Sequence, residues 1–391
     1  MKTMSMSNVT PESLVLSSIL AEYNDTNGTT RSMLERTPMP PPQADLGAII
    51  GLSILFSAIV LVGIVGNGLV IFVILADRKM RQSVTNIFIM NLAIADFFIM
   101  AFGIPELVQF IMNRGWILGG GLCKFNRFTL VVSLYASVMS LVSVCIERFV
   151  AIVFPIKAHI LCTRKKIIGV VASIWPIAVC CGLPTVLFNI VVPLAPGHPV
   201  SLCQLIFPTG HHSTFLAFKY LESCFYYIIP IITQVVLYSI IGRRLYASTE
   251  ELSTKFQMRQ NSRNRTDRAY ETIRARKGVV KMLIVSVVIY FISYSPIQVH
   301  LFYNTFSTTP LPTGWPFLVF VMTMTHVNSA ANPVLYCIFS QNFRRNFKKC
   351  LCYLCFRMQR KAYRRTRFDS FDSKGALSRR PSTTKTTVSR F

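Results

Sequence analysis

Residues 122–155 read LCKFNRFTLVVSLYASVMSLVSVCIERFVAIVFP, and this stretch decides the fold. It is a long apolar run with Cys123 near its start and an acid and a base, Glu147 and Arg148, near its end. About 20 mostly apolar residues suffice to cross a bilayer, and ionisable groups at membrane depth are costly and therefore candidates for function. We interpret the stretch as the central helix of a membrane bundle, anchored at Cys123 and carrying a cytoplasmic switch at Arg148.

Long apolar runs recur along the rest of the chain. Of its 391 residues, 52% are hydrophobic, which is more apolar side chain than one soluble core needs. Backbone groups that face lipid must be satisfied within their own segment, so we expect each run to be a helix. The sequence predicts an all-α membrane protein, a seven-transmembrane helix bundle with a short amphipathic eighth helix. The predicted spans are residues 47–76, 84–112, 122–153, 167–192, 214–242, 278–304 and 315–339.

Basic residues lie in alternate connections between these runs. The net charge is +25, yet residues 193–213 and 305–314 hold no Lys, Arg, Asp or Glu, whereas residues 243–281 and the C-terminal tail are rich in Lys and Arg. Basic residues keep short loops in the cytoplasm. The pattern therefore predicts a multi-pass plasma-membrane protein with an extracellular N-terminus and a cytoplasmic C-terminus, and it argues against a nucleic-acid partner.

The segments predicted to lie outside carry features of secreted chains. Residues 1–46 are predicted to be an extracellular glycosylated tail, because glycosylation sequons begin at Asn8, Asn24 and Asn27. Cys123 and Cys203 are both expected outside, where a disulfide can persist. Such a bond would hold the outer loop over the mouth of a domain formed by residues 47–340.

A carboxylate lies deep within the second predicted span. Asp96 is ten or more residues from either membrane face, and an isolated charge there costs at least about 2.5–3.5 kcal/mol. It should hold a cation or a proton, or lie in a polar pocket with water. In the sixth span Pro296 removes a backbone hydrogen bond, which permits a bend or pivot.

After the last span, residues 341–355 are predicted to form a membrane-surface helix and a palmitoylation site. Aromatic residues lie four apart among basic ones, a pattern typical of a helix on an anionic membrane surface. Juxtamembrane cysteines Cys350, Cys352 and Cys355 follow, and acylation is favoured over a metal site because no His is nearby. Residues 356–391 are predicted to be a disordered cytoplasmic tail, rich in Ser and Thr.

Taken together, the motifs resemble those of rhodopsin-like (class A) G protein-coupled receptors, across residues 47–355. Each motif alone is weak, but their order and the spans that carry them make the resemblance specific. The motifs are Gly66-Asn67, Leu92-Ala93-Ile94-Ala95-Asp96, Cys123 with Cys203, Glu147-Arg148-Phe149, Trp175, Pro230 with Tyr238, Pro296 and Asn332-Pro333-Val334-Leu335-Tyr336.

The resemblance implies an activation switch. In the family, the arginine at Arg148, restrained by its neighbour Glu147, is released when the sixth helix swings outward, and it then meets a heterotrimeric G protein. Ser293-Tyr294-Ser295-Pro296 stands where Cys-Trp-x-Pro is common, so any aromatic toggle would be Tyr294. The expected switch residues are Glu147, Arg148, Tyr238, Tyr294, Pro296, Asn332, Pro333 and Tyr336. Ile156, an apolar residue on the second inner loop, is an expected G protein contact together with Arg148.

The resemblance also implies an allosteric sodium ion and no other cofactor. In similar receptors the positions of Asp96, Ser137, Asn328 and Asn332 hold sodium with water, which favours the inactive state. Oxygen ligands suit such a hard cation, and a hydrogen-bonded water cluster is the alternative. At the tail, the resemblance implies arrestin and receptor kinases as partners.

The expected ligand is a peptide, which places the chain in the neuropeptide receptor branch. Leu130 stands where receptors for biogenic amines carry an Asp. The mouth offers a mixed-charge set better matched to a peptide. The candidate ligand-binding residues are Glu106, Arg127, Lys219, Glu222, Gln298, Tyr303 and His326.

Other functions are kept as alternatives. A class A receptor for a small non-amine or lipid ligand is one, and a membrane transporter is another, although no internal repeat supports the transporter. An enzyme finds little support, because the paired histidines His211 and His212 lie in a predicted outer loop without helical metal-ligand spacing.

Overall fold

The computed structural model describes residues 46–111, 115–193, 201–207, 212–258, 263–306, 315–350 and 352. The predicted glycosylation sites Asn8, Asn24 and Asn27, the predicted palmitoylation site Cys355 and the tail 356–391 lie outside these residues. The chain divides into two units, Met1–Phe339 and Ser340–Phe391. We describe each unit by itself.

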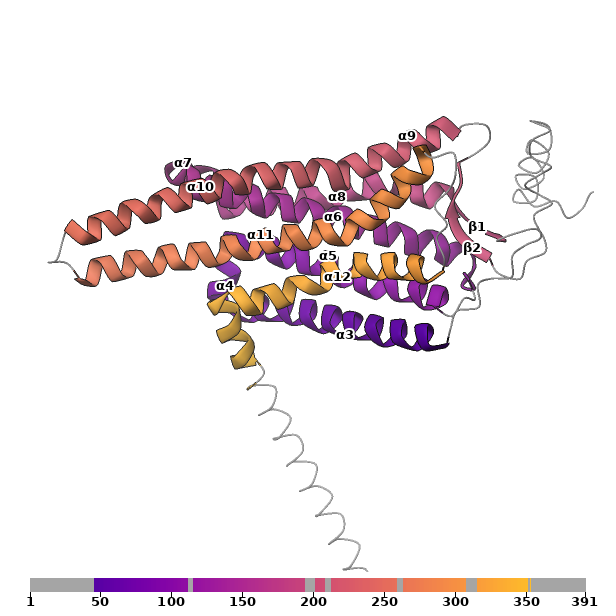
Figure 1. Cartoon of the computed structure of the whole chain (residues 1–391), viewed down its shortest axis with the longest axis horizontal. Coiled ribbons are helices and arrows are strands. Elements are labelled where there is room, and N and C mark those ends of the chain that lie inside the picture. Colours follow the sequence, from indigo (N-terminus) through magenta and orange to yellow (C-terminus); the bar gives the residue numbers. More distant parts are fainter. Residues whose placement is uncertain are drawn as a thin grey trace, which may run out of the picture. The chain divides into compact units, whose positions relative to one another are not determined.

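Seven long helical segments make up most of the described part of the first unit (Figure 1). Their positions match the seven predicted spans, and six of them are long and apolar enough to cross a membrane. The last, α12, completes the bundle by packing against α11, α3 and α5. The segments are α3 (Leu46–Ala76), α5 (Val84–Ile111), α6 (Gly119–Val153), α8 (Arg164–Phe188), α9 (His212–Ser223) continuing through η1 (Cys224–Ile228) into α10 (Ile229–Met258), α11 (Arg263–Phe306) and α12 (Trp315–Phe339).

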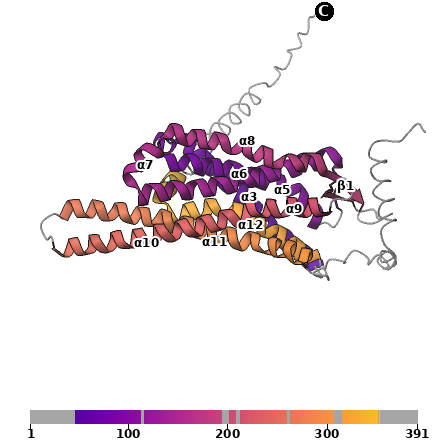
Figure 2. The ribbon, with the colours of Figure 1, turned by 90° about the horizontal axis from the view of Figure 1, so that it is seen from above.

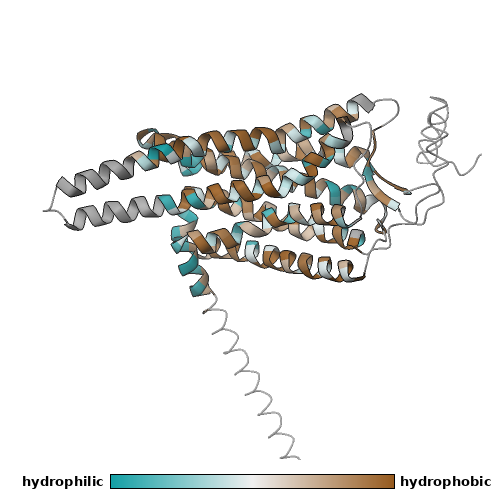
Figure 3. Cartoon of the chain, viewed as in Figure 1, coloured by the Kyte–Doolittle hydropathy of each residue, from teal (hydrophilic) through white to brown (hydrophobic). Residues whose placement is uncertain are grey.

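Helix α6 is the central helix, as predicted, because α5, α8 and α10 all pack against it. Small side chains allow the close approach: Ala95, Ala136 and Ala178, one from each of α5, α6 and α8, are fully buried in one cluster. Large apolar residues such as Leu61 and Ile232 are instead exposed on the outside, where lipid would cover them. Hydrophobic colouring accordingly dominates the middle of the bundle (Figure 3).

The two longest segments extend well past the predicted spans. Helix α10 continues to Met258, whereas the sequence predicted that this span ends at residue 242. Helix α11 begins at Arg263, whereas the sequence predicted a start at residue 278. The added residues are polar and charged with good helix propensity, so the helix continues in water beyond the apolar run. Figures 1 and 2 show the two helices running side by side past the ends of the others.

A β-hairpin replaces the predicted end of the fourth span. Helix α8 ends at Phe188, and β1 (Asn189–Pro193) pairs antiparallel with β2 (Ser201–Leu205). The helix prediction to residue 192 was wrong there because Asn189 turns its side chain back to the Thr185 carbonyl at 2.6 Å and a β-branched run follows. The predicted Cys123–Cys203 disulfide is present, with Cα atoms 5.7 Å apart, and ties β2 to the start of α6.

Two short helices lie at the opposite end of the bundle from this hairpin: α4 (Arg78–Gln82) and α7 (Pro155–Leu161) (Figure 1). Asp77 caps α4 by accepting a hydrogen bond from the Lys79 N–H at 2.7 Å. We call the two ends the hairpin end and the Arg148 end.

The second unit begins with the predicted surface helix. Residues 341–350 and 352 are helical, and Ser340 precedes them as a capping residue whose hydroxyl accepts from the Phe343 N–H at 3.5 Å. The rings of Phe343 and Phe347 lie 5.7 Å apart, so the aromatic spacing seen in the sequence forms a contact on one helix face.

Candidate functional site

At the Arg148 end, the guanidinium of Arg148 folds back onto its neighbour. Its Nε lies 2.6 Å from one carboxylate oxygen of Glu147, and a terminal nitrogen donates to the other at 2.6 Å. Thr85, at the start of α5, accepts from Arg148 and donates to Glu147 at 3.3 Å. Glu147 is almost fully buried, and the hydrogen bonds from Arg148 and Thr85 satisfy its carboxylate. The sequence did not indicate Thr85, because nothing distinguishes it from other hydroxyl residues near a span end.

Two other predicted switch residues lie inside the bundle. Tyr238 of α10 and Tyr336 of α12 are buried. Ile156 on α7 is 83% exposed, which makes it one of the most exposed apolar side chains at this end. The Arg148 end therefore combines a restrained cation with an exposed apolar contact.

Asp96 joins three helices at the centre of the bundle. Its carboxylate accepts hydrogen bonds from Ser137 of α6 at 2.9 Å, from Ser329 of α12 at 2.9 Å and from Asn332 of α12 at 2.7 Å. Asn332 in turn accepts from Ser286 of α11 at 3.1 Å, which adds a fourth helix to the network. A fully buried carboxylate needs such donors, because it has no water to solvate it.

Of the predicted Asp96 partners, Ser137 and Asn332 contact it, whereas Asn328 is not among its hydrogen-bond donors. Ser329 donates to Asp96 where Asn328 was expected to do so. Residues three and four before Asn332 share its helix face, so the sequence alone did not choose between Ser329 and Asn328. The Asn328 amide oxygen is buried without a partner among the described residues.

Proline explains two further polar contacts between helices. Pro333 has no N–H to give the carbonyl four residues earlier, that of Ser329, and Asn67 of α3 donates to this carbonyl at 3.0 Å. Pro230 likewise cannot serve the carbonyl of Tyr226, and the hydroxyl of Tyr290 in α11 donates there instead. Tyr226 lies within η1, the π-helical turn that the sequence did not predict.

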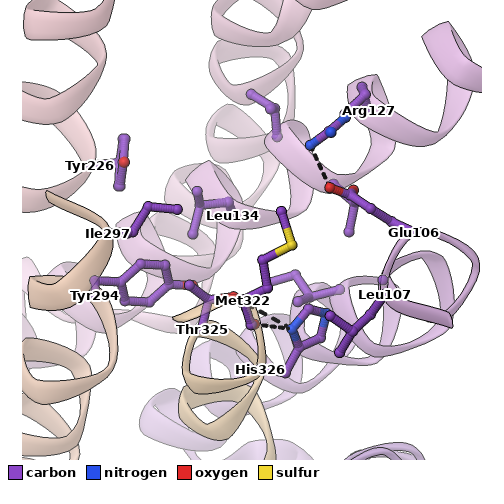
Figure 4. Close-up of a pocket in the computed structure, with 14 residues that line it drawn as sticks. Glu106, Leu107, Arg127, Leu134, Tyr226, Tyr294, Ile297, Met322, Thr325 and His326 are labelled. Atoms are coloured by element: carbon purple, nitrogen blue, oxygen red, sulfur yellow. Dashed lines mark hydrogen bonds and ion pairs between the residues drawn. The ribbon is translucent and has the colours of Figure 1, made fainter. Parts of the chain in front are cut away.

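At the hairpin end, a cavity of about 220 Å³ opens between α5, α6, η1, α11 and α12 (Figure 4). We call it the inner cavity. Three of the predicted ligand-binding residues, Glu106, Arg127 and His326, line it. The remaining lining residues are mostly apolar: Ile99, Gly103, Leu107, Leu130, Val131, Leu134, Tyr226, Tyr294, Ile297, Met322 and Thr325.

An ion pair closes one side of the inner cavity. An Arg127 nitrogen lies 2.7 Å from a Glu106 oxygen, and a second nitrogen donates to the Cys203 carbonyl at 3.2 Å. Figure 4 shows this pair across the cavity from Tyr226 and Tyr294. Arg127 thereby joins α5, α6 and the hairpin strand β2 at one point.

Four predicted ligand-binding residues lie outside the inner cavity. Lys219 and Glu222 pair with each other at 2.7 Å along α9, and Tyr303 is 42% exposed. Gln298 donates to the Tyr226 hydroxyl and so supports the cavity wall from behind. The sequence did not indicate the apolar lining, because a cavity-facing Leu or Ile has the same pattern as a lipid-facing one.

Tyr294, the predicted toggle, lines the inner cavity and connects it to the core. It is buried, its ring lies 5.0 Å from that of Tyr290, and it lies two residues before Pro296. A group entering the inner cavity would thus contact α11 directly beside its proline.

Comparisons with known proteins agree with this geometry. Residues 66–336 match the model of the 7 transmembrane receptor (rhodopsin family). The chain is 32% identical over 306 residues to neuropeptide receptor 15 of Caenorhabditis elegans, covering 76% of this chain and 88% of that protein. It is 28% identical to the substance-P receptor of Aquarana catesbeiana, over 76% of this chain and 69% of that protein. It is 30% identical to the thyrotropin-releasing hormone receptor of Gallus gallus, over 75% and 76% respectively.

The family match covers well over half of the chain, and the buried polar contacts of Asp96, Arg148 and Asn67 lie within it. These proteins are receptors and not enzymes. The chain belongs to the rhodopsin family of seven-transmembrane receptors.

Proposed function

We propose that this receptor binds an extracellular neuropeptide at its hairpin end and activates a heterotrimeric G protein at its Arg148 end. The observation that carries the proposal is the restrained Arg148, held by Glu147 and Thr85 beside an exposed Ile156, at the end of the bundle opposite the inner cavity. Relatives named as receptors for neuropeptides, substance P and thyrotropin-releasing hormone support a peptide ligand.

The proposed topology places the receptor in the plasma membrane with the hairpin end outside and the C-terminus in the cytoplasm. Two features support this orientation. The hairpin carries a disulfide, which persists in an oxidising compartment. The chain between α10 and α11 and the tail are rich in Lys and Arg, as cytoplasmic segments are.

In the proposed mechanism, ligand binding shifts α11. The ligand contacts Tyr294 in the inner cavity, and Pro296 lets the inner half of α11 swing outward. The hydrogen bond from Ser286 to Asn332 would break, since it joins α11 to α12. Arg148 would then leave Glu147 and Thr85 and meet the G protein, with Tyr238 and Tyr336 repositioned around it.

A sodium ion fits the Asp96 network as an allosteric ligand. The donor set is entirely oxygen: the Asp96 carboxylate, the Ser137 and Ser329 hydroxyls and the unpartnered Asn328 amide oxygen. Sodium would neutralise the buried carboxylate and favour the arrangement described here. If so, sodium raises the melting temperature of the purified receptor relative to potassium, and Asp96→Asn abolishes that difference.

The second unit is the proposed site of membrane and regulatory contacts. Its basic amphipathic helix would lie on anionic lipid, with acylation at Cys350, Cys352 and Cys355. Phosphorylation of the Ser- and Thr-rich tail by receptor kinases would create an arrestin-binding segment.

One alternative has an observation in its favour. The mostly apolar lining of the inner cavity also suits a small non-amine or lipid ligand. Screening peptide and lipid libraries in parallel separates the two, because only one class should activate the receptor at low concentration.

The decisive experiment measures guanine nucleotide exchange on purified G protein with the receptor in lipid nanodiscs. We expect a peptide from the library to accelerate exchange and Arg148→Gln to abolish the stimulated rate. Arg81→Gln, which removes the same charge at an exposed position of α4, serves as the matched control. A full stimulated response from correctly inserted Arg148→Gln receptor would refute the proposed function.

A further inference from the structure

Two cavities of similar size meet at the Glu106–Arg127 ion pair. Beside the inner cavity lies a second one of about 210 Å³, which we call the outer cavity. It is bordered by the end of α5, the loop before α6 and the hairpin: Gln109, Gly115, Trp116, Leu202, Cys203 and Gln204. Glu106, Arg127 and Met322 line both cavities, so the ion pair lies at the passage from one to the other.

The inner cavity offers no unpaired charge. Among the described residues that line it, only Glu106 and Arg127 are fully charged, and each is the other's partner. His326 donates from Nδ1 to the Met322 carbonyl at 2.8 Å, and its Nε2 is buried without a partner among the residues that the structure describes, which favours a neutral ring. Thr325 donates to the same carbonyl at 2.7 Å, and Tyr226 accepts from Gln298. A charged ligand group placed here would find no counter-ion among the described lining residues that is not already paired.

The ion pair is held in place from several sides. Arg127 also donates to the carbonyl of Cys203, and that residue is fixed by its disulfide to Cys123 in the same helix as Arg127. The Trp116 N–H donates to the Ser201 carbonyl at 2.6 Å, which ties the adjoining loop to β2. The side chains are only 13% exposed for Glu106 and 32% for Arg127. A passing ion would have to separate two partly buried partners and leave one of them unpaired.

We infer that the Glu106–Arg127 pair is a charge-selective passage that admits only uncharged groups to the inner cavity. The end of the ligand that reaches Tyr294 is then neutral and largely apolar, while charged groups of the same ligand stay in the outer cavity, where the lining residue Gln204 is exposed. This deepens the proposed function by naming the chemistry of the inserted end. Glu106 and Arg127 act as specificity determinants and not as partners for a ligand charge.

The passage can be tested without the natural ligand. A cysteine introduced by Leu134→Cys in the inner cavity is labelled with three methanethiosulfonates that carry a benzyl, a sulfonatoethyl or a trimethylammonioethyl group. In each case the thiolate displaces methanesulfinate and forms a mixed disulfide. Ile117→Cys, at a position 68% exposed near the hairpin, gives the reference rate for each reagent, and receptor without an added cysteine corrects for native thiols. Mass spectrometry of the modified peptide measures the rates.

Relative to Ile117→Cys, we expect both charged reagents to label Leu134→Cys at least about tenfold more slowly than the neutral one. Neutralising either partner of the ion pair should make the passage favour one of the two charged reagents, and the favoured charge should differ between the two variants. Added to Leu134→Cys, Arg127→Gln leaves Glu106 unpaired and should speed the cationic reagent, whereas Glu106→Gln should speed the anionic one. Val131→Cys, also in the inner cavity, is a second reporter if the Leu134 variant is poorly expressed.

Equal relative rates for all three reagents in the otherwise unaltered receptor would overturn the inference. A shift in the same direction for both neutralised variants would also overturn it, because a loosened structure admits every reagent alike. The labelling requires neither a ligand nor a G protein. Its failure therefore leaves the proposed function standing, and failure of nucleotide exchange leaves the charge selectivity intact.

Discussion

His326 of α12 occupies the space beside Gly103 of α5 that a Cβ atom at Gly103 would fill. Its ring is fixed there by the Nδ1 hydrogen bond to the Met322 carbonyl and by an edge contact with Phe56 of α3, with centroids 5.6 Å apart. Three helices therefore meet at one imidazole in the wall of the inner cavity. The absence of a side chain at Gly103 is what allows the contact.

Gly103→Ala should destabilise the receptor by about 1–3 kcal/mol, because the new methyl group collides with the His326 ring, which can move away only by giving up its hydrogen bond to Met322 and its contact with Phe56. The melting temperature in nanodiscs measures the loss. Gly68→Ala is the matched control in α3, where an added Cβ meets nothing within 4 Å. Combining Gly103→Ala with His326→Ala should recover part of the loss, and no recovery would show that the strain lies elsewhere.

Thr85→Val should raise nucleotide exchange in the absence of ligand by up to about tenfold, because it removes the hydroxyl that holds Arg148 beside Glu147 while keeping the side-chain shape. Basal exchange at equal receptor density is the measurement. Thr129→Val makes the same change where the hydroxyl bonds only to the Phe125 carbonyl of its own helix, and it should leave basal exchange unaltered. An unchanged rate for Thr85→Val would remove Thr85 from the restraint.

Ser329→Ala should cost about 1–3 kcal/mol of stability, because a fully buried carboxylate loses one of its three donors. Asn328→Ala should cost less, since Asn328 is not among the donors to Asp96. Thermal unfolding of both variants in potassium buffer compares them without any contribution from sodium. The reverse order of the two costs would contradict the hydrogen-bond assignment.

Tyr290→Phe should lower the free energy of unfolding by about 1–3 kcal/mol, because the Tyr226 carbonyl, which Pro230 cannot serve, would be buried without a donor. Tyr303→Phe removes a hydroxyl from a well-exposed ring of the same helix and should have little effect. Equal melting temperatures for the two variants would mean that another group satisfies the carbonyl.

Much of the architecture followed from the sequence because a bilayer imposes a simple length and polarity rule. Seven apolar runs gave seven helices, and the Cys123–Cys203 bond followed from the two cysteines expected on the same side. Where the rule does not apply, prediction failed. The polar extensions of α10 and α11 and the hairpin after Phe188 lie beyond the apolar runs, so hydrophobicity did not locate their ends.

Physical reasoning from the residues alone indicated site residues where a residue type was unusual for its surroundings, whereas Ser137, Asn332 and Tyr294 followed from the family resemblance. Asp96, Arg148, Glu106 and Arg127 stood out as ionisable groups within or beside apolar runs, and the structure brings each into a specific polar contact. Common residues carried no such signal. Which hydroxyl group reaches Asp96, and which apolar side chain lines the inner cavity, depends on how each helix is rotated relative to its neighbours.

The number of membrane crossings, their order and the buried charges could thus be predicted before any coordinates were known, because burying a charge or an unpaired peptide group in hydrocarbon is too costly to occur by accident. Only the tertiary structure decided that Ser329 and not Asn328 serves Asp96, that Tyr290 completes the carbonyl freed by Pro230, and that two cavities meet at one ion pair. Those relationships depend on distances of a few ångströms between helices that are far apart in the chain. Helical periodicity shows which side chains share a helix face, but it does not show which other helix that face contacts.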